Sequence, residues 1–371
     1  MKKFLCPIVL TGLMANTIYA EVIEISDIDI SETNREDLDV NSTTNLYRIE
    51  KTAQFGTEVI TKEDIAAQNP KDFFDLLNKA VGLDVTYQGR KHPYFINMRG
   101  GGNITYILDG AILTGTSDRI LTKLPMAAIE EIQIVRTSTA ITLAPSIDIG
   151  ASNSGSGTNI GFIIIRTKQP KKTEAILSSY YEKAQGHPGA NGQSLYVGTT
   201  LNDEKPLNGY IGGMFSRLDR PSNKDWFDAT KSKGGMVNAG INYDRLHINL
   251  MGYKDDGSFE MQKGVDTNGN ISNVEWYYDP IKTKLFSLDG NMQWTPNQIT
   301  LFSFSNLKYE QTEHTNVNKS YEEKTQTYSL RHNMQFDNTL IQLGTQFTHS
   351  KGLGANLSKA YNKYDLSLIH I

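Results

Sequence analysis

The second half of the sequence limits the fold most strongly, because its segments of about ten residues alternate in polarity. The clearest segment runs from 284 to 294, with Phe286, Leu288, Met292 and Trp294 on one side and Ser287, Asp289, Asn291 and Gln293 on the other. Successive side chains of a β-strand point to opposite faces, so each segment predicts an antiparallel strand with one apolar and one polar face. About ten such strands follow Pro170.

The links between these segments alternate in length. Short links at 202–208, 244–245, 295–298 and 337–338 are separated by longer links, including 218–234 and 254–283. Barrels of the bacterial outer membrane show this alternation, because their turns are short on one side and their loops are long on the other. The alternation therefore favours a transmembrane antiparallel β-barrel over a soluble β-sandwich. A transmembrane helix is not predicted after residue 20, since no apolar run approaches about 20 residues.

The first twenty residues, MKKFLCPIVLTGLMANTIYA, predict a secretory signal peptide. Lys2 and Lys3 precede an apolar run, and Ala20 is a small residue at the cleavage position. A short buried helix is the alternative. Cys6 lies within this segment, so the mature chain is expected to contain no disulfide, no thiol nucleophile and no cysteine-bound metal. The formal net charge is −4 without a polybasic block, which predicts no nucleic-acid partner.

Residues 21–55 predict a flexible acidic segment. Between positions 21 and 46 the only basic residue is Arg35, whereas acidic residues recur throughout. A segment with so few large apolar side chains cannot bury enough surface to order itself. Its first six residues, EVIEIS, alternate in polarity, which suits an extended strand that adds to the sheet edge of another protein. A linker with chance alternation is the alternative.

Residues 56–170 predict a compact α+β domain. Thr61 followed by Asp64 predicts the start of a helix, and Asn69-Pro70 predicts the start of a second helix that Gly82 ends. Short apolar segments predict strands at 83–87, 95–98, 105–108, 111–113, 129–135 and 160–167. Asp109 and Gly110 predict a tight hairpin turn, because glycine readily adopts a positive φ.

No constellation of residues indicates an enzyme. The seven histidines are scattered, and the sequence contains no His-Glu-x-x-His, Gly-x-Ser-x-Gly or Gly-Lys-Ser/Thr motif. Glu130 and Glu131 are adjacent on a predicted strand and therefore point to opposite faces, which rules out shared acid-base work. The chain is predicted to be no enzyme and to have no cofactor and no metal site.

The order of five segments resembles the plug domain of TonB-dependent outer-membrane receptors. They are 60-ITKEDI-65, 75-DLLNKAVGLDV-85, 96-INMRGGGNITYILDG-110, 124-LPMAAIEEIQIVR-136 and 160-IGFIIIRTK-168. The segments after Pro170 resemble the first strands of the receptor barrel, so the resemblance extends from the signal peptide to the end of the chain. It implies an α+β plug domain at 56–170 followed by a transmembrane antiparallel β-barrel at 171–365.

The family's plug blocks a barrel of twenty-two strands, so the resemblance implies a truncated barrel with about ten of the expected twenty-two strands. The last six residues, 366-LSLIHI-371, can be encoded by the transposase mosaic-end adapter of sequencing libraries. We therefore interpret residues 366–371 as a non-native tail and the chain as a truncated receptor.

The resemblance implies TonB-dependent active import of a scarce nutrient across the bacterial outer membrane, with a ferric siderophore or another iron complex as the expected cargo. The implied partners are the TonB energy-transducing complex, an anionic ferric chelate or similar small ligand, and outer-membrane lipid. The TonB-box candidate comprises Glu21, Val22, Ile23, Glu24, Ile25 and Ser26. Two alternatives remain, namely a plugless porin-like channel or adhesin barrel, and a secreted soluble β protein.

The resemblance also implies where the ligand binds. The candidates at the plug apices are Arg90, Lys91, His92, Tyr94, Gly101, Gly102, Asn103, Thr116, Ser117 and Asp118. The positive charge of Arg90, Lys91 and His92 suits an anionic chelate, and solvated loop charge without a role is the alternative. Aromatic residues of the outer loops either line a binding vestibule or form a membrane-interface girdle, and they are Trp226, Phe227, Trp276, Tyr277 and Tyr278.

Arginines are expected to hold the plug in the barrel. Arg99 and Arg136 match the plug arginines that family members pair with glutamates of late barrel strands, and capping of strand ends in solvent is the alternative. Gly100, Asp109 and Gly110 are expected in structural turns. The resemblance implies that the glycine-rich stretch after Arg99 is a turn at a plug apex, where the backbone passes tightly inside the barrel and glycine avoids a Cβ clash.

Overall fold

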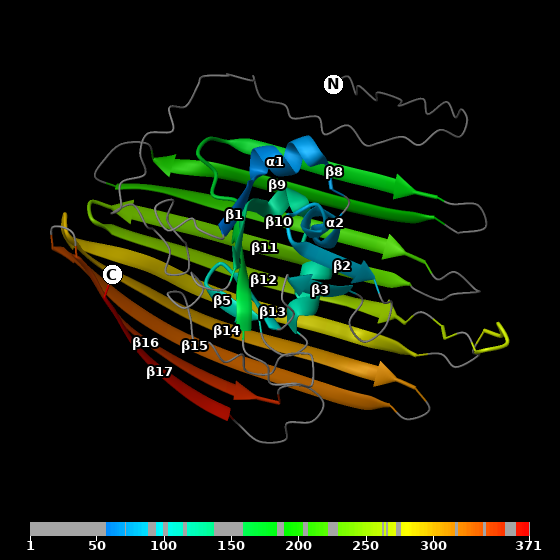
Figure 1. Ribbon diagram of the computed structural model, residues 1–371. Coiled ribbons are helices and arrows are strands. Elements are labelled where there is room, and N and C mark those ends of the chain that lie inside the picture. The colour runs from blue at the N-terminus through cyan, green and yellow to red at the C-terminus, as the bar shows by residue number, and fades with distance from the viewer. Residues whose placement is uncertain are drawn as a thin grey trace, which may run out of the picture.

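The computed structural model of the chain contains a small α+β domain lying against one face of a large antiparallel sheet, the wall (Figure 1). The structure describes residues 57–70, 72–87, 94–98, 103–113, 117–136, 159–183, 189–202, 207–221, 229–261, 263–264, 266–271, 276–315, 318–336, 339–352 and 361–370. The α+β domain comprises the described residues from 57 to 168, and the wall comprises the strands between 174 and 370.

Helix α1 (Lys62–Gln68) begins with a capping box. The Thr61 hydroxyl accepts a hydrogen bond from the Asp64 backbone at 3.3 Å, and the Asp64 carboxylate accepts one from the Thr61 backbone at 2.9 Å. These bonds satisfy backbone donors that a helix start leaves free, and the predicted start at Thr61 is confirmed. Within the described residues, no helix is long and apolar enough to cross a membrane.

Helix α2 (Phe73–Asn78) begins later than predicted, so the expected start at Asn69-Pro70 is wrong. Asn69 has a left-handed φ of 41° and ends α1 instead. The Asp72 side chain accepts hydrogen bonds from the backbone N–H groups of Phe74 and Asp75 at 3.0 and 2.9 Å, and this cap sets the start.

The end of α2 also differs from the prediction, because the helix stops at Asn78 rather than at Gly82. Lys79 and Ala80 donate their backbone N–H groups to residues three positions earlier, so the chain tightens into turns before the strand begins. Gly82 has a φ of 72° and lies in these turns, where a side chain would be strained.

Five strands form the sheet of the α+β domain, in the order β1 (Thr57–Thr61), β6 (Ile129–Arg136), β7 (Asn159–Thr167), β4 (Asn103–Leu108) and β5 (Ala111–Leu113). Strands β4 and β7 are parallel, and the other neighbours are antiparallel. A separate hairpin joins β2 (Leu83–Tyr87) to β3 (Tyr94–Met98), and the 3-10 helices η3 (Ser117–Thr122) and η4 (Met126–Ala128) follow β5. The predicted strands of this domain are confirmed.

The hairpin between β4 and β5 turns at Asp109 and Gly110, as predicted. Both residues have positive φ angles, 42° and 79°, which a two-residue hairpin turn requires. The tip of this hairpin reaches the wall, because a Cβ on Gly110 would lie 3.6 Å from the Cβ of Ser303 and 3.7 Å from the Cβ of Asp289. Glycine at position 110 therefore allows both the turn conformation and the close approach of the hairpin to the wall.

Ten antiparallel strands form the wall, each paired with its neighbour in the sequence. They are β8 (Glu174–Glu182), β9 (Ala190–Asn202), β10 (Leu207–Arg220), β11 (Thr230–Tyr243), β12 (Leu246–Glu260), β13 (Tyr277–Thr295), β14 (Gln298–His314), β15 (Lys319–Phe336), β16 (Thr339–Lys351) and β17 (Tyr361–His370). The expected number of about ten strands is confirmed. Residues 366–370 lie within β17, paired with β16.

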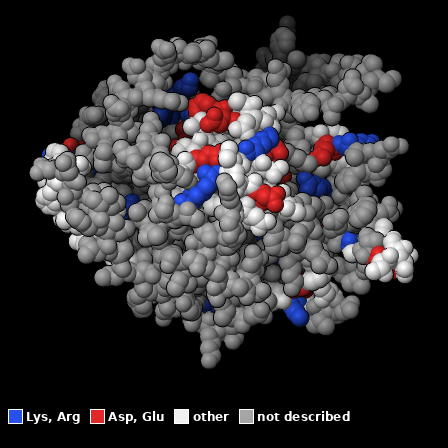
Figure 2. All heavy atoms as spheres, in the orientation of Figure 1, with Lys and Arg blue, Asp and Glu red and all other residues white. Residues whose placement is uncertain are grey.

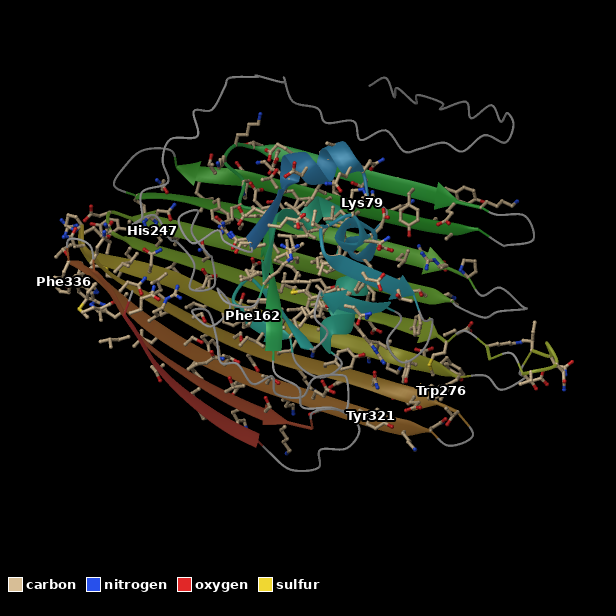
Figure 3. The ribbon with its side chains drawn as sticks, in the orientation of Figure 1. Lys79, Phe162, His247, Trp276, Tyr321 and Phe336 are labelled. Atoms are coloured by element: carbon tan, nitrogen blue, oxygen red, sulfur yellow. The ribbon has the colours of Figure 1, made fainter. Side chains whose placement is uncertain are left out.

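The two ends of the wall differ in their connections. Links at 203–206, 244–245, 296–297 and 337–338 form the turn end, whereas 221–229 and 261–276 belong to the loop end. His247 and Phe336 lie near the turn end, and Trp276 and Tyr321 lie near the loop end (Figure 3). The predicted alternation of link lengths is therefore confirmed.

The wall is polar on the face toward the α+β domain and apolar on its outer face. Buried polar side chains include Ser194, Ser232, Asn238, Asp255, Ser287, Asp289, Asn291, Thr325 and Thr327. Exposed apolar side chains include Leu177, Leu195, Val197, Ile211, Phe215, Val237, Ile241, Phe286 and Leu330. A soluble sandwich buries its apolar faces, whereas a barrel in lipid turns them outward. The wall has the polarity predicted for a barrel and not that of a soluble sandwich.

The helical face of the α+β domain carries mixed charges (Figure 2). Lys62 pairs with Glu130 at 3.1 Å, and Lys79 pairs with Asp75 at 3.5 Å, with all four side chains partly exposed. Solvent screens such pairs, so each contributes only about 0 to 1 kcal/mol. The domain is therefore more strongly held on its opposite side, where charged groups are buried against the wall.

We predict that Gly110→Val destabilises the fold more than Gly269→Val does. Both glycines have a positive φ, so both substitutions incur similar backbone strain, but nothing lies within 4 Å of a Cβ on Gly269. The valine methyl groups at position 110 would crowd the wall and add roughly 1 to 3 kcal/mol of overpacking. Urea unfolding of the two variants measures the difference, and equal losses would contradict a tightly seated hairpin tip.

Candidate functional site at the interface between the domain and the wall

Arg119, in η3, inserts its side chain into the wall. Its guanidinium donates hydrogen bonds to Gln311 Oε1 at 2.5 Å and to the Tyr309 hydroxyl at 3.5 Å, and its Cζ lies 4.5 Å from the ring centroid of Tyr278. The residue is 5% exposed. A desolvated cation over an aromatic face gains about 2 kcal/mol, so the ring and the amide oxygen offset the loss of water. Arg119 thus connects η3 to β13 and β14.

Lys123, one residue beyond η3, forms an ion pair that water does not reach. Its Nζ lies 2.7 Å from Asp255 Oδ1 on β12, and the two side chains are 3% and 0% exposed. The Tyr253 hydroxyl donates a further hydrogen bond to Asp255 Oδ2 at 2.9 Å. Removing one partner of such a pair leaves an uncompensated buried charge, which makes the pair a strong positional constraint. It links the α+β domain to the neighbouring strand of the wall.

Asp109 connects the hairpin tip to β7 and, through it, to the wall. Its carboxylate accepts hydrogen bonds from the Thr167 N–H at 2.9 Å and the Thr167 hydroxyl at 2.5 Å. Asn238 of β11 donates from Nδ2 to Thr167 Oγ1 at 3.4 Å and to the carbonyl oxygen of Lys168. Burial raises the pKa of the Asp109 carboxyl above its ordinary value of 3.8, against the lowering effect of the Thr167 hydrogen bonds and the Arg166 charge.

Apolar side chains fill the space between these polar contacts. Tyr196, Met214, Met236, Met251, Leu285 and Leu307 of the wall belong to the same buried cluster as the core of the α+β domain. A second cluster joins Ile107, Val135, Phe162 and Ile164 of the domain to Ile299 and Leu301 of β14. Phe162 lies between the domain and the wall (Figure 3). The domain and the wall therefore share one packed interior.

Most of the predicted ligand and partner residues lie outside the described residues. These are Arg90, Lys91, His92, Gly101, Gly102, Thr116, the TonB-box candidate at 21–26, and the aromatic residues Trp226 and Phe227; Arg99 and Gly100 also lie outside them. Tyr94 begins β3, Asn103 begins β4, and Ser117 and Asp118 begin η3. The assignment of these residues to ligand and TonB contacts remains a prediction.

Arg136 has partners within its own domain. Its Nη2 lies 2.8 Å from Glu58 Oε2 on β1 and donates a hydrogen bond to the carbonyl oxygen of Val81. Both side chains of the ion pair are partly exposed, at 23% and 28%. Arg136 therefore holds the first strand to β6, and a contact with glutamates of the barrel wall remains a prediction.

The described aromatic residues near the loop end point in different directions. Tyr278 is buried beneath Arg119, together with Phe259, Ile281 and Tyr309. Trp276 is partly buried against the same cluster. Tyr277 stacks on His314 instead, with ring centroids 4.5 Å apart and an interplanar angle of 11°. Tyr278 thus contributes to the contact between domain and wall, a role that the sequence did not indicate.

Arg119 and Lys123 were missed as contact residues. Their side-chain partners are distant in the sequence. The sequence separation is 192 residues for Arg119 and Gln311 and 132 residues for Lys123 and Asp255. The only local signal is that Arg119 and Lys123 are two cations four positions apart in the mainly apolar segment 119-RILTKL-124. Buried cations are rare without partners, so this segment could have been singled out, but not its partners.

Comparisons with known proteins agree with this geometry. Residues 50–161 match the family model of the TonB-dependent receptor plug domain. Similar solved structures include the ferric citrate transporter FecA in its unliganded form, with 13% identity and a TM-score of 0.62 over 85% of this chain and 50% of that chain. A mutant of the ferric enterobactin receptor PfeA from Pseudomonas aeruginosa has 14% identity and a TM-score of 0.61 over 87% and 56%. No curated protein matches the sequence.

A third similar structure is FpvA of Pseudomonas aeruginosa bound to a heterologous pyoverdine with iron, with 11% identity and a TM-score of 0.59 over 85% of this chain and 53% of that chain. The chain thus spans about half the length of these receptors. Residues 50–161 are therefore a TonB-dependent receptor plug domain, and the chain as a whole has the fold of such a plug with part of the barrel around it. The α+β domain is the plug, and the wall is part of the barrel.

We predict that Lys123→Met destabilises the seating of the plug by about 3 to 5 kcal/mol, because the Asp255 carboxylate would stay buried without a cation. Lys79→Met removes a partly exposed pair and is the matched control, with an expected loss below about 1 kcal/mol. The free energy of unfolding in urea measures both. Adding Asp255→Asn to Lys123→Met should restore part of the loss, and a loss no larger than that of Lys79→Met would contradict this role.

We predict that Asp109 makes the fold less stable as the pH rises above 3.8. The pKa of the Asp109 carboxyl is higher in the folded protein than in the unfolded chain. At a pH between these two pKa values the folded protein binds more protons than the unfolded chain. The free energy of unfolding therefore decreases as the pH rises through this window. Asp109→Asn removes this term, since the amide stays neutral. The stability of the wild type relative to the variant should fall by at most about 1.4 kcal/mol per pH unit in that window. A difference that is constant with pH would contradict the assignment.

Proposed function

We propose that the chain is part of an outer-membrane receptor that imports a scarce nutrient, an iron complex, in a TonB-dependent manner. One observation carries this proposal: a family plug domain is seated by buried polar contacts against the polar face of a wall whose outer face is apolar. The apolar outer face suits lipid, and the buried contacts hold an object that blocks the space inside the wall. A passive channel has no need of such a plug.

The cargo is proposed from the similar solved structures and from the positive charge of one predicted loop of the plug. FecA is a ferric citrate transporter, PfeA a ferric enterobactin receptor, and FpvA is bound to a ferric pyoverdine. The names of the first two and the bound ligand of the third all refer to ferric chelates, which supports a chelate as the class of cargo for this chain. Arg90, Lys91 and His92 would supply positive charge toward an anionic chelate, and Tyr94 would supply an aromatic face.

The position of β1 supports coupling to TonB. Among the described strands, β1 is an edge strand that pairs only with β6, and it directly follows the acidic segment that contains the TonB-box candidate at 21–26. A pull on that segment would reach β1 first and strain the pair between Glu58 and Arg136. An edge strand separates from its sheet more easily than a central one, because only one ladder of hydrogen bonds must break.

We predict that uptake requires TonB and the segment 21–26. The gene would be deleted in its source bacterium and replaced by one of three versions of the intact receptor gene. The first is unchanged, the second lacks the codons for residues 21–26, and the third lacks those for residues 30–35 as a length-matched control. Uptake of radioactive iron would be measured with ferric citrate and with ferric catecholate and hydroxamate siderophores. We expect uptake of at least one chelate to be lost without TonB and without 21–26, and to be retained without 30–35.

Two results would contradict the proposed function. Uptake that persists in cells lacking TonB would indicate passive passage through a channel. Recovery of the receptor in the soluble periplasmic fraction, instead of the outer-membrane fraction, would exclude a membrane receptor altogether.

A further inference from the structure

Five lysines stand side by side across five neighbouring strands of the wall. The strand register places Lys254 of β12 opposite Lys284 of β13, Lys284 opposite Lys308 of β14, Lys308 opposite Lys324 of β15, and Lys324 opposite Lys351 of β16. Neighbouring strands are about 4.8 Å apart, so the row extends over roughly 19 Å. These five residues are the lysine row.

The lysine row is on the outer face of the wall. Lys254, Lys284, Lys324 and Lys351 are exposed, and Lys308 is half-buried. The residue that follows or precedes each lysine in its strand points inward and is buried, as Asp255, Leu285, Leu307, Thr325 and Ser350 show. The row therefore faces away from the plug and cannot contribute to the interface between plug and wall.

A second row runs parallel to the lysine row on the same outer face. It is apolar and aromatic, and its members in register are Leu250, Leu288, Phe304, Tyr328 and Phe347. Each member lies four positions from the lysine of its own strand, in the direction of the turn end. Four positions correspond to about 14 Å along a strand. Phe304 and Tyr328 have ring centroids 4.9 Å apart, and Tyr328 and Phe347 6.1 Å apart.

The local carboxylates do not balance the lysine row. Two positions closer to the loop end, the described residues of the same strands carry one cation, Lys282, and three anions, Asp256, Glu310 and Glu322. Six cations therefore stand against three anions in the two rows together. Glu322 pairs with Lys308 at 3.3 Å and with Lys324 at 2.5 Å, and Glu310 also pairs with Lys308. Within the part of the chain that the structure describes, Lys254, Lys284 and Lys351 form no ion pair.

Like charges directly opposite one another destabilise a sheet. Because Lys254, Lys284 and Lys351 have no carboxylate partner among the described residues, the row calls for a counter-charge from outside the chain. That partner must also tolerate the apolar row beside the lysines. We propose that the lysine row binds the phosphate groups of an anionic lipid whose acyl chains lie on the apolar row. Each lysine near an anionic lipid surface adds electrostatic attraction, and a phosphate can bridge two neighbouring ammonium groups. The inference rests on the proposed function in that it requires the wall to lie in a membrane.

The test places the full chain in three kinds of vesicle. The first contains phosphatidylcholine alone, and the other two also contain about 5 mol% of a bisphosphorylated glycolipid or of its dephosphorylated form. This low content limits bulk charge effects. Three variants are compared with the wild type. In the first, all five lysines of the row become glutamine; in the second, all five become arginine. The third is a matched control with glutamine at five exposed lysines elsewhere, Lys79, Lys171, Lys172, Lys183 and Lys319. Native mass spectrometry and phosphorus analysis give the lipid phosphate retained per chain.

The wild type, the arginine variant and the control should retain the phosphorylated glycolipid, and the glutamine variant should bind it at least about tenfold more weakly. Retention by the glutamine variant equal to that of the wild type would overturn the inference. So would equal retention of the dephosphorylated glycolipid, or equally tight binding of free inorganic phosphate. A wild-type chain that enters phosphatidylcholine vesicles but does not select the phosphorylated glycolipid refutes only this inference, whereas a chain that enters no vesicle refutes the proposed membrane function as well.

Discussion

The inverted polarity of the wall is the constraint on which the rest of the structure depends. Its backbone groups pair within the sheet, but its inward side chains are polar and buried, and buried polar groups need hydrogen-bond partners. The plug provides several of them. Lys123 neutralises Asp255, Arg119 donates to Gln311, and the carbonyl of Lys168 accepts from Asn238. The plug is therefore part of what makes the wall's inner face stable, as well as an obstacle inside it.

The same contacts explain how the plug can be held in place against the wall and still be displaced from it. When the plug moves away from the wall, water can replace the lost partners of the polar contacts, whereas purely apolar contacts lose their whole stabilisation. Three of the wall residues in the shared apolar cluster are Met214, Met236 and Met251 on neighbouring strands, with Met214 directly opposite Met236. Methionine has an unbranched, flexible side chain that fits surfaces of varied shape. An interface of this kind holds the plug in one position yet tolerates its displacement.

Local patterns in the sequence predicted the local structure well. The capping residues Thr61 and Asp64, the turn at Asp109-Gly110 and the two faces of the strand around Phe286 all depend on interactions within a few residues. The start of α2 failed because Asn69 ended one helix and Asp72 capped the next, and both residue types fit either role. The contacts of Arg119 and Lys123 could not be predicted, because their partners become neighbours only once the strands of the wall are assembled in register.

Strand register joins the two faces of the wall into one constraint. A slip of one residue in β13 would carry Ser287 and Asp289 outward and Phe286 and Lys284 inward, so the plug contacts and the lysine row would be lost together. The register is therefore specified from both sides at once, by polar partners within and by apolar and cationic rows outside. Once the register is set, the faces are separated by the sheet, and substitutions on opposite faces with no shared partner should act additively. Substitutions on the outer face of the wall can therefore alter its outer surface without altering how the plug is held inside.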